Sequence, residues 1–161
     1  NLQALPKGGV LTMGEAYLSV SPQSYVDLVV PKVQQTAITF NYSHSIPYSP
    51  NSTGSDQATV WSTTFSFVPT MVEITMPTFS CTFSGVTPSY TQGQVVYINS
   101  GGTFTLINGT QNSGNYYRTI NCYFILSGST LSIVASWTFK VSGHNFPFSI
   151  SANGVVEASK T

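Results

Sequence analysis

The feature that most constrains the fold of this chain is a regular alternation of apolar and polar residues. The clearest run covers residues 131–141, where the alternating apolar positions are Leu131, Ile133, Ala135, Trp137, Phe139 and Val141. Side chains two residues apart lie on one face of a β-strand, so this run predicts a strand with one face on a core. Shorter alternating runs occur at 38–42, 59–67 and 79–83.

Other segments fit the same class of structure. Residues 115–126 (NYYRTINCYFIL) are largely apolar or aromatic at both alternating sets of positions, which predicts a central strand. The pairs Asn108-Gly109 and Asn153-Gly154 favour tight hairpin turns, because both turn residues need positive φ. Further turns are expected at 99–102, 127–129 and 142–145. These signals predict an all-β fold, an antiparallel β-sandwich of about eight to ten strands, with a barrel as the other arrangement.

The chain is expected to form one domain with a short extension. Its 161 residues suit a single core. Residues 1–34 show no clean alternation, so we expect an N-terminal arm or connector there and a sandwich domain over 35–161. The longest polar stretch, 43–58, reads as a loop, and a loop of that length is usually functional. Since the chain starts at Asn1, we expect it to be a fragment or a processed product.

Charge is scarce, and this excludes several classes of function. Only 6% of the residues are charged and the formal net charge is zero, against an average of about 25% charged. Nucleic-acid binding needs a basic patch, which so few cations cannot build. No apolar run is long enough to insert into a membrane as a helix. A chain without net charge tends to associate, which favours an oligomer.

The residues that usually carry catalysis or bind metals are few and scattered. The five acids are Glu15, Asp27, Asp56, Glu73 and Glu157. No nucleophile motif accompanies them, so we predict neither an enzyme nor a cofactor. A glycan-cleaving pair of carboxylates that only the fold brings together stays open as an alternative. The histidines do not have the spacing of a structural zinc site, so no metal is expected.

The two cysteines each lie in an apolar run. Cys81 and Cys122 are expected to be buried thiols that behave as small apolar residues. A disulfide between neighbouring strands is the alternative, and it would indicate an oxidising compartment.

Aromatic residues stand beside amides in three loop-like segments. Aromatic rings stack on the C–H face of a sugar, and amides and carboxylates form hydrogen bonds with its hydroxyls. Tyrosine is also a favoured anchor of protein interfaces. For each residue the competing interpretation is simple packing within a strand. The candidate binding residues are Tyr42, His44, Tyr48, Asn51 and Asp56; Asn112, Asn115, Tyr116, Tyr117 and Arg118; and His144 and Asn145, next to Phe146.

Two short segments resemble parts of bacteriophage tail fibres. Residues 5–14 (LPKGGVLTMG) resemble the "LP-x-x-GG-T-M-T-G" segment of their stalks, with Val10-Leu11 inserted and the second threonine missing. Residues 65–74 (FSFVPTMVEI) resemble the "F-x-F-x-P-x-x-V-x-I" strand of β-rich terminal domains in phage tail and prophage proteins. An adenovirus-type fibre head would share this architecture.

The resemblance implies the distal, receptor-binding head of a viral fibre. Such a head is normally a homotrimer at the tip of a virion and contacts a glycan or protein on the host cell surface. Residues 1–34 would then connect the head to a stalk. The main alternative is a monomeric bacterial adhesin or carbohydrate-binding module.

Overall fold

We describe a computed structural model over residues 32–46, 52–83, 86–113, 116–141 and 146–161. These residues form eight β-strands and no helix, so none of them forms a helix able to cross a membrane. The strands are β1 (Lys32–Ile46), β2 (Ser52–Thr64), β3 (Met71–Cys81), β4 (Val95–Asn99), β5 (Thr103–Ser113), β6 (Tyr116–Ser127), β7 (Thr130–Val141) and β8 (Phe146–Lys160).

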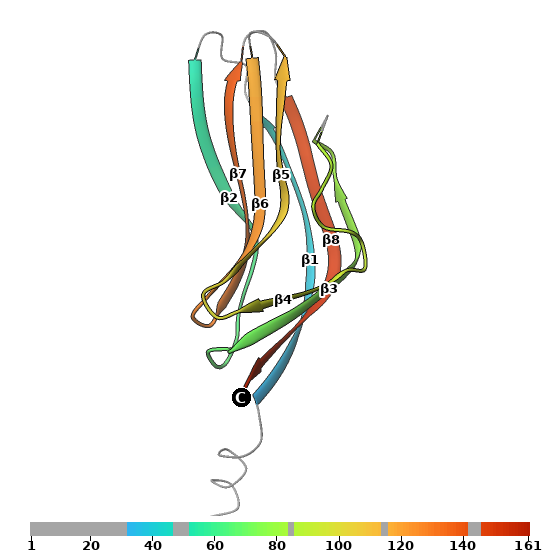
Figure 1. Ribbon diagram of the computed structural model, residues 1–161, viewed down its shortest axis with the longest axis vertical. Helices are drawn as coiled ribbons and strands as arrows, with labels where there is room; N and C mark the ends of the chain where they lie inside the picture. The colour runs from blue at the N-terminus through green and yellow to red at the C-terminus, as the bar shows by residue number, and fades with distance from the viewer. Residues whose placement is uncertain (1–31, 47–51, 84–85, 114–115, 142–145) are drawn as a thin grey trace, which may run out of the picture. The chain divides into compact units, whose positions relative to one another are not determined.

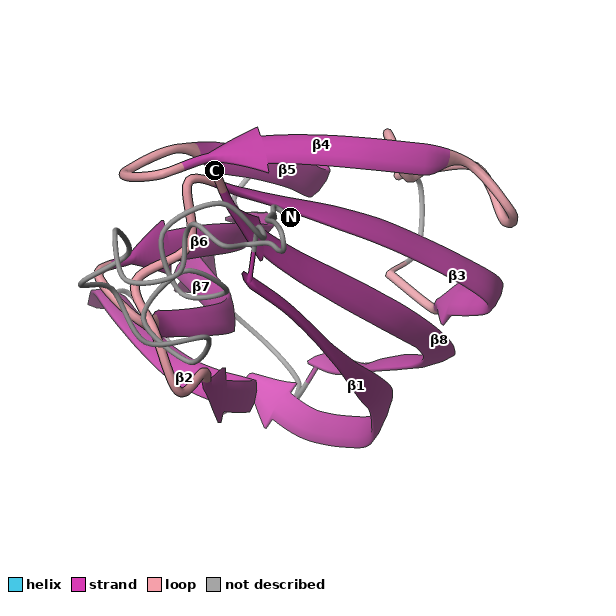
Figure 2. Ribbon diagram, turned by 90° about the horizontal axis from the view of Figure 1, so that it is seen from below, coloured by secondary structure: helices cyan, strands magenta, loops and turns pink. Residues whose placement is uncertain are grey.

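The eight strands form two antiparallel sheets that pack face to face, which confirms the predicted β-sandwich (Figures 1 and 2). The first sheet has the order β1-β8-β3-β4, and the second has the order β2-β7-β6-β5. The chain crosses between the sheets after β1, β2, β4 and β7. As predicted, the apolar segment 116–126 lies in a central strand, β6, between β7 and β5.

The core lies between the sheets and is built by the alternating apolar positions. Every second residue of β1, β6, β7 and β8 points inward, so the period-two pattern separates core from surface as expected. Fully buried members include Ile38, Ile74 and Ile150 of the first sheet and Ile120, Phe124 and Ile133 of the second.

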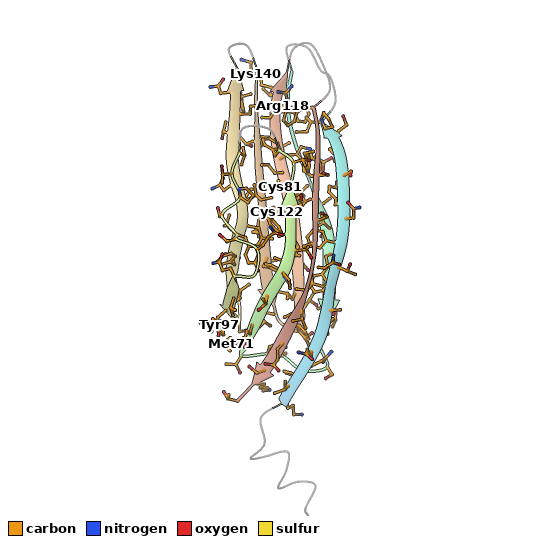
Figure 3. All side chains as sticks on the ribbon, turned by 90° about the vertical axis from the view of Figure 1, so that its right-hand side faces the viewer. Met71, Cys81, Tyr97, Arg118, Cys122 and Lys140 are labelled. Carbon is orange, nitrogen blue, oxygen red and sulfur yellow. The ribbon has the colours of Figure 1, made fainter. Side chains whose placement is uncertain are left out.

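The sandwich has two distinct ends, which we call the base and the tip. At the base, Lys32 pairs with Lys160, and the turns at 100–102 and 128–129 join strands of the sheets. At the tip lie the ends of β1, β5 and β7 and the beginnings of β2, β6 and β8. Figure 3 shows Met71 and Tyr97 toward the base and Arg118 and Lys140 toward the tip.

The predicted polar loop at 43–58 is wrong. Strand β1 continues through Ile46, and β2 already begins at Ser52, so most of this stretch is strand. The polarity was misleading because β1 and β2 are edge strands, whose outward residues are small and polar. The expected loop at 142–145 lies outside the described residues.

The two Asn-Gly pairs are not hairpin turns. Asn108 and Gly109 lie within β5, and Asn153 and Gly154 lie within β8. Each glycine is required by a close neighbour instead: a Cβ on Gly154 would stand 2.3 Å from the Thr75 carbonyl oxygen. The turns expected at 99–102 and 127–129 are present, with positive φ at Gly101 and Gly128.

Two strand boundaries also differ from expectation. The alternating run 59–67 leaves the strand after Thr64, and β3 begins only at Met71. A bulge between Thr59 and Trp61 interrupts the run within β2. Strand β1 begins at Lys32, three residues before residue 35, the expected start of the sandwich.

The cysteines are free and belong to different sheets. Cys122 of β6 is buried, as expected, whereas Cys81 of β3 is half-buried. Because they lie in opposite sheets, a disulfide between neighbouring strands does not form here. Burial, with a smaller contribution from the charge of Cys81, raises the pKa of Cys122 to about 12.

Candidate functional site

The predicted binding residues that the structure describes converge on the tip, although they come from four strands. Six are described with their side chains: Tyr42, His44, Asp56, Asn112, Tyr117 and Arg118. Tyr116 begins β6, and its side chain is outside the described set. Tyr48, Asn51, Asn115, His144 and Asn145 lie outside the described residues.

The first group lies where the edge strands β1 and β2 meet, a site that we call the seam. Tyr42 and His44 point inward, and the His44 ring centroid is 4.5 Å from that of Trp137 in the opposite sheet. Asp56 pairs with Trp137 in the β2–β7 register and is exposed. Burial, and then the charge of Asp56, raises the pKa of Tyr42. The seam therefore presents an imidazole, a phenol and a carboxylate around a buried indole.

Arg118 is buried between the sheets, although its sequence neighbours Tyr116 and Tyr117 suggest a place on the surface. Its side chain is only 2% exposed and points between the sheets, away from the face that carries Tyr117. The guanidinium carbon lies 4.0 Å from the centroid of the Phe146 ring, and Nη1 donates a hydrogen bond to Oε1 of Gln111 (3.2 Å). Arg118 thus joins the two sheets at the tip, since Phe146 belongs to the first sheet and Gln111 to the second.

Asn112 and Tyr117 lie on the outer face of the second sheet. They are direct partners in the β5–β6 register, and Lys140 of β7 stands beside Tyr117. An amide, a phenol and an ammonium group are therefore neighbours on an open surface. This is a surface suited to hydrogen bonding.

The outer face of the first sheet carries a depression at the tip that the sequence did not predict. It has a volume of about 400 Å³, and four of its seven lining residues are serine or threonine. The lining residues are Ser43, His44, Ser45, Thr82, Pro147, Phe148 and Ser149. The sequence signal for this surface is the alternation of Ser43 and Ser45 with His44, which is typical of a strand and not of a loop.

Nearer the base, the fold pairs two acids that are distant in the sequence. Glu73 of β3 and Glu157 of β8 are direct partners in the register. This is the juxtaposition that the glycan-cleaving alternative requires. Neither residue lines the depression at the tip. Among the described residues, no group of three or more metal-binding side chains occurs.

Comparison with protein-family models, curated proteins and solved structures finds no match for this chain. The functional assignment therefore depends on the geometry of the tip and on the composition of the chain.

Proposed function

We propose that this chain is the head domain of a viral fibre, that of a phage, and that it attaches the virion to a receptor on the host cell surface. The head works as a homotrimer at the fibre tip, outside the cell, and performs no catalysis. Its receptor is a glycan or a protein, and the contact is made through the tip of the sandwich.

The observation that carries this proposal is the separation of the two ends. The described chain starts at Lys32 and its last strand ends at Lys160, and these residues pair at the base. The candidate aromatic, amide and carboxylate groups lie at the opposite end. A domain attached through one end and bearing its recognition groups at the other suits a terminal adhesive head.

Matched pairs of variants test this assignment. The fluorescently labelled chain is applied to a panel of intact bacterial cells, and bound label is measured by flow cytometry. Asp56→Ala and Tyr117→Ala change the tip; Glu157→Ala and Tyr97→Ala remove the same chemistry nearer the base. We expect the tip variants to lose at least about tenfold in affinity, since interface anchors are worth more than about 1.4 kcal/mol. Equal losses from both pairs, or no binding to any cell, would refute the proposal.

One observation favours the monomeric adhesin or carbohydrate-binding module as a second candidate. The described sandwich buries its core between its own two sheets without a second chain. A monomer is therefore structurally self-sufficient. The mass of the chain in solution separates the two candidates, as discussed below.

A further inference from the structure

Small, uncharged polar side chains cover the tip half of the outer face of the first sheet. The register places them in rows across three strands, and we call the set the polar lane. It consists of Thr39, Asn41 and Ser43 of β1; Ser149, Ser151 and Asn153 of β8; and Thr78, Ser80 and Thr82 in or just after β3.

The base half of the same face has a different chemistry. Tyr97 is 60% exposed there, and Val33 and Val155 are also exposed. The paired acids Glu73 and Glu157 lie among them. The polar lane is thus a bounded surface, and its lack of charge is not a property of the whole sheet.

A depression marks each end of the lane. The one at the tip, described above, holds about 400 Å³, and the second holds about 320 Å³. The second is lined by Thr75, Pro77, Thr78, Asn153, Gly154 and Val155. Each depression includes one exposed proline, which offers a small apolar surface beside the hydroxyls. Ser149 and Asn153 are four residues apart on β8, so the depressions are roughly 13 Å apart.

Hydrogen bonds hold the polar groups of the lane in place. The Thr82 amide donates to the Ser149 carbonyl (2.9 Å), and the Ser149 amide donates to Oγ1 of Thr82 (3.1 Å). Their two hydroxyl oxygens are 2.8 Å apart. At the other end of the lane, the Thr39 hydroxyl donates to Oδ1 of Asn153 (2.7 Å). Groups fixed in this way lose less side-chain entropy when a ligand binds.

The chemistry of the polar lane indicates which class of ligand it can bind. No charged side chain belongs to the lane or lines the tip depression, so a charged ligand would lose solvation there without gaining a partner. Seven hydroxyls and two amides, Asn41 and Asn153, suit a ligand that is itself uncharged and rich in hydroxyls. Two depressions joined by a row of hydroxyls suit an elongated ligand better than a single sugar.

We infer that the polar lane binds a linear, uncharged oligosaccharide of the host surface, with one sugar ring in each depression. This inference rests on the proposed function and adds a glycan contact on the first sheet to the tip contacts of Asp56 and Tyr117, which belong to the second sheet. A single site on an open sheet face is expected to be weak. Several heads in one fibre would raise the avidity without new contacts.

Titration of the whole chain with defined oligosaccharides tests the inference. The probes are the hexasaccharides cellohexaose, maltohexaose and chitohexaose, with a charged oligogalacturonate for comparison, and binding is followed by saturation-transfer NMR. At least one neutral hexasaccharide should bind, and more tightly than its methyl monosaccharide. Thr82→Val and Thr78→Val, at the two ends of the lane, should each weaken binding about fivefold, the value of one hydrogen bond.

The matched control is Thr110→Val, an exposed threonine of β5 on the outer face of the second sheet, which should leave binding unchanged. The inference is overturned if no neutral hexasaccharide binds, if the oligogalacturonate binds more tightly, or if either lane variant behaves as wild type. The cell-binding assay separates this failure from failure of the proposed function. Cells bound through the tip without oligosaccharide binding would leave the head assignment intact and point to a protein receptor.

Discussion

At the scale of single residues, Arg118 shows how a buried charge can join the two sheets at the tip. It is the one arginine of the chain and is almost fully buried. Its aliphatic stem fills space between the sheets, while its guanidinium stacks on Phe146 and binds Gln111. Its neighbours in sequence suggested a surface contact, because a sequence does not show which face of a strand a residue occupies until the register is known.

Truncating Arg118 should destabilise the fold through lost volume. We expect Arg118→Ala to lower the free energy of unfolding by about 2–4 kcal/mol, as for other large-to-small changes in a core. Arg118→Met keeps most of the volume and removes the buried charge, so it should lose less than half as much. Urea unfolding of the two variants measures the difference. Equal losses would show that the charge, and not the packing, is what matters.

The Cys122 thiol should make stability depend on pH in the alkaline range. Its pKa is about 12 in the folded chain, mainly because it is buried, against an ordinary value of 9.0. The folded chain keeps this proton when the unfolded chain has released it. The resulting stabilisation is therefore complete below about pH 9 and is lost as the pH rises toward about 12.

The comparison of wild type with Cys122→Ala isolates this effect from the tyrosines. The difference between their free energies of unfolding should fall as the pH rises above about 9, by at most about 1.4 kcal/mol per pH unit. Urea titrations at several pH values measure it. A difference that stays constant with pH would show that Cys122 does not titrate in this way.

At the scale of strands, the alternation of apolar residues predicted strands correctly, whereas the Asn-Gly pairs wrongly predicted hairpin turns. The alternation at 131–141 identified β7, and the two-sided apolar character of 115–126 identified central β6. The edge strands were harder, because hydroxyl-bearing residues on an open face resemble a loop in composition. Asn-Gly pairs failed as turn signals because a glycine is also needed wherever another segment of the chain approaches the backbone closely. The candidate site was predictable in its residue types, whereas its clustering at the tip required the register.

Gly154 provides the test at this scale. Its Cβ would meet the backbone of β3, at 2.3 Å from the Thr75 oxygen and 2.7 Å from Cα of Met76. The pairing of β3 with β8 has a bulge between Thr75 and Thr78, beside Gly154. We expect Gly154→Ala to cost about 1–3 kcal/mol or more, since β3 must move at this bulge. At Gly109 the obstacle is the Val86 side chain, so Gly109→Ala should be partly rescued by Val86→Ala. Thermal or urea unfolding measures both; an unaffected Gly154→Ala would contradict the register at the bulge.

At the scale of the whole molecule, two features support the proposed function. The chain has few charges, and the sandwich has two distinct ends. Its hydroxyls are many, and none of the described charged side chains belongs to the polar lane. In the proposed function, the base would attach the head to a fibre and the tip would contact the receptor. Assembly into a trimer would place several tips side by side and increase avidity.

Light scattering of the purified chain tests the assembly. We expect a mass near three times the 17.3 kDa of one chain. The mass should not change on dilution through the micromolar range, because an obligate oligomer is held by a large interface. A species at the mass of one chain would favour the monomeric adhesin or carbohydrate-binding module.

The central claim is that the head attaches to the host cell through its tip. The most direct test blocks one end of the sandwich at a time. A polyethylene glycol chain is coupled to a new surface thiol, at the tip in Thr53→Cys and at the base in Ser127→Cys, with the wild-type chain as control for the two native thiols. Binding of each conjugate to host cells is then measured. We predict that the tip conjugate no longer binds and that the base conjugate binds as wild type. Loss of binding from the base conjugate, or full binding by the tip conjugate, would contradict the account.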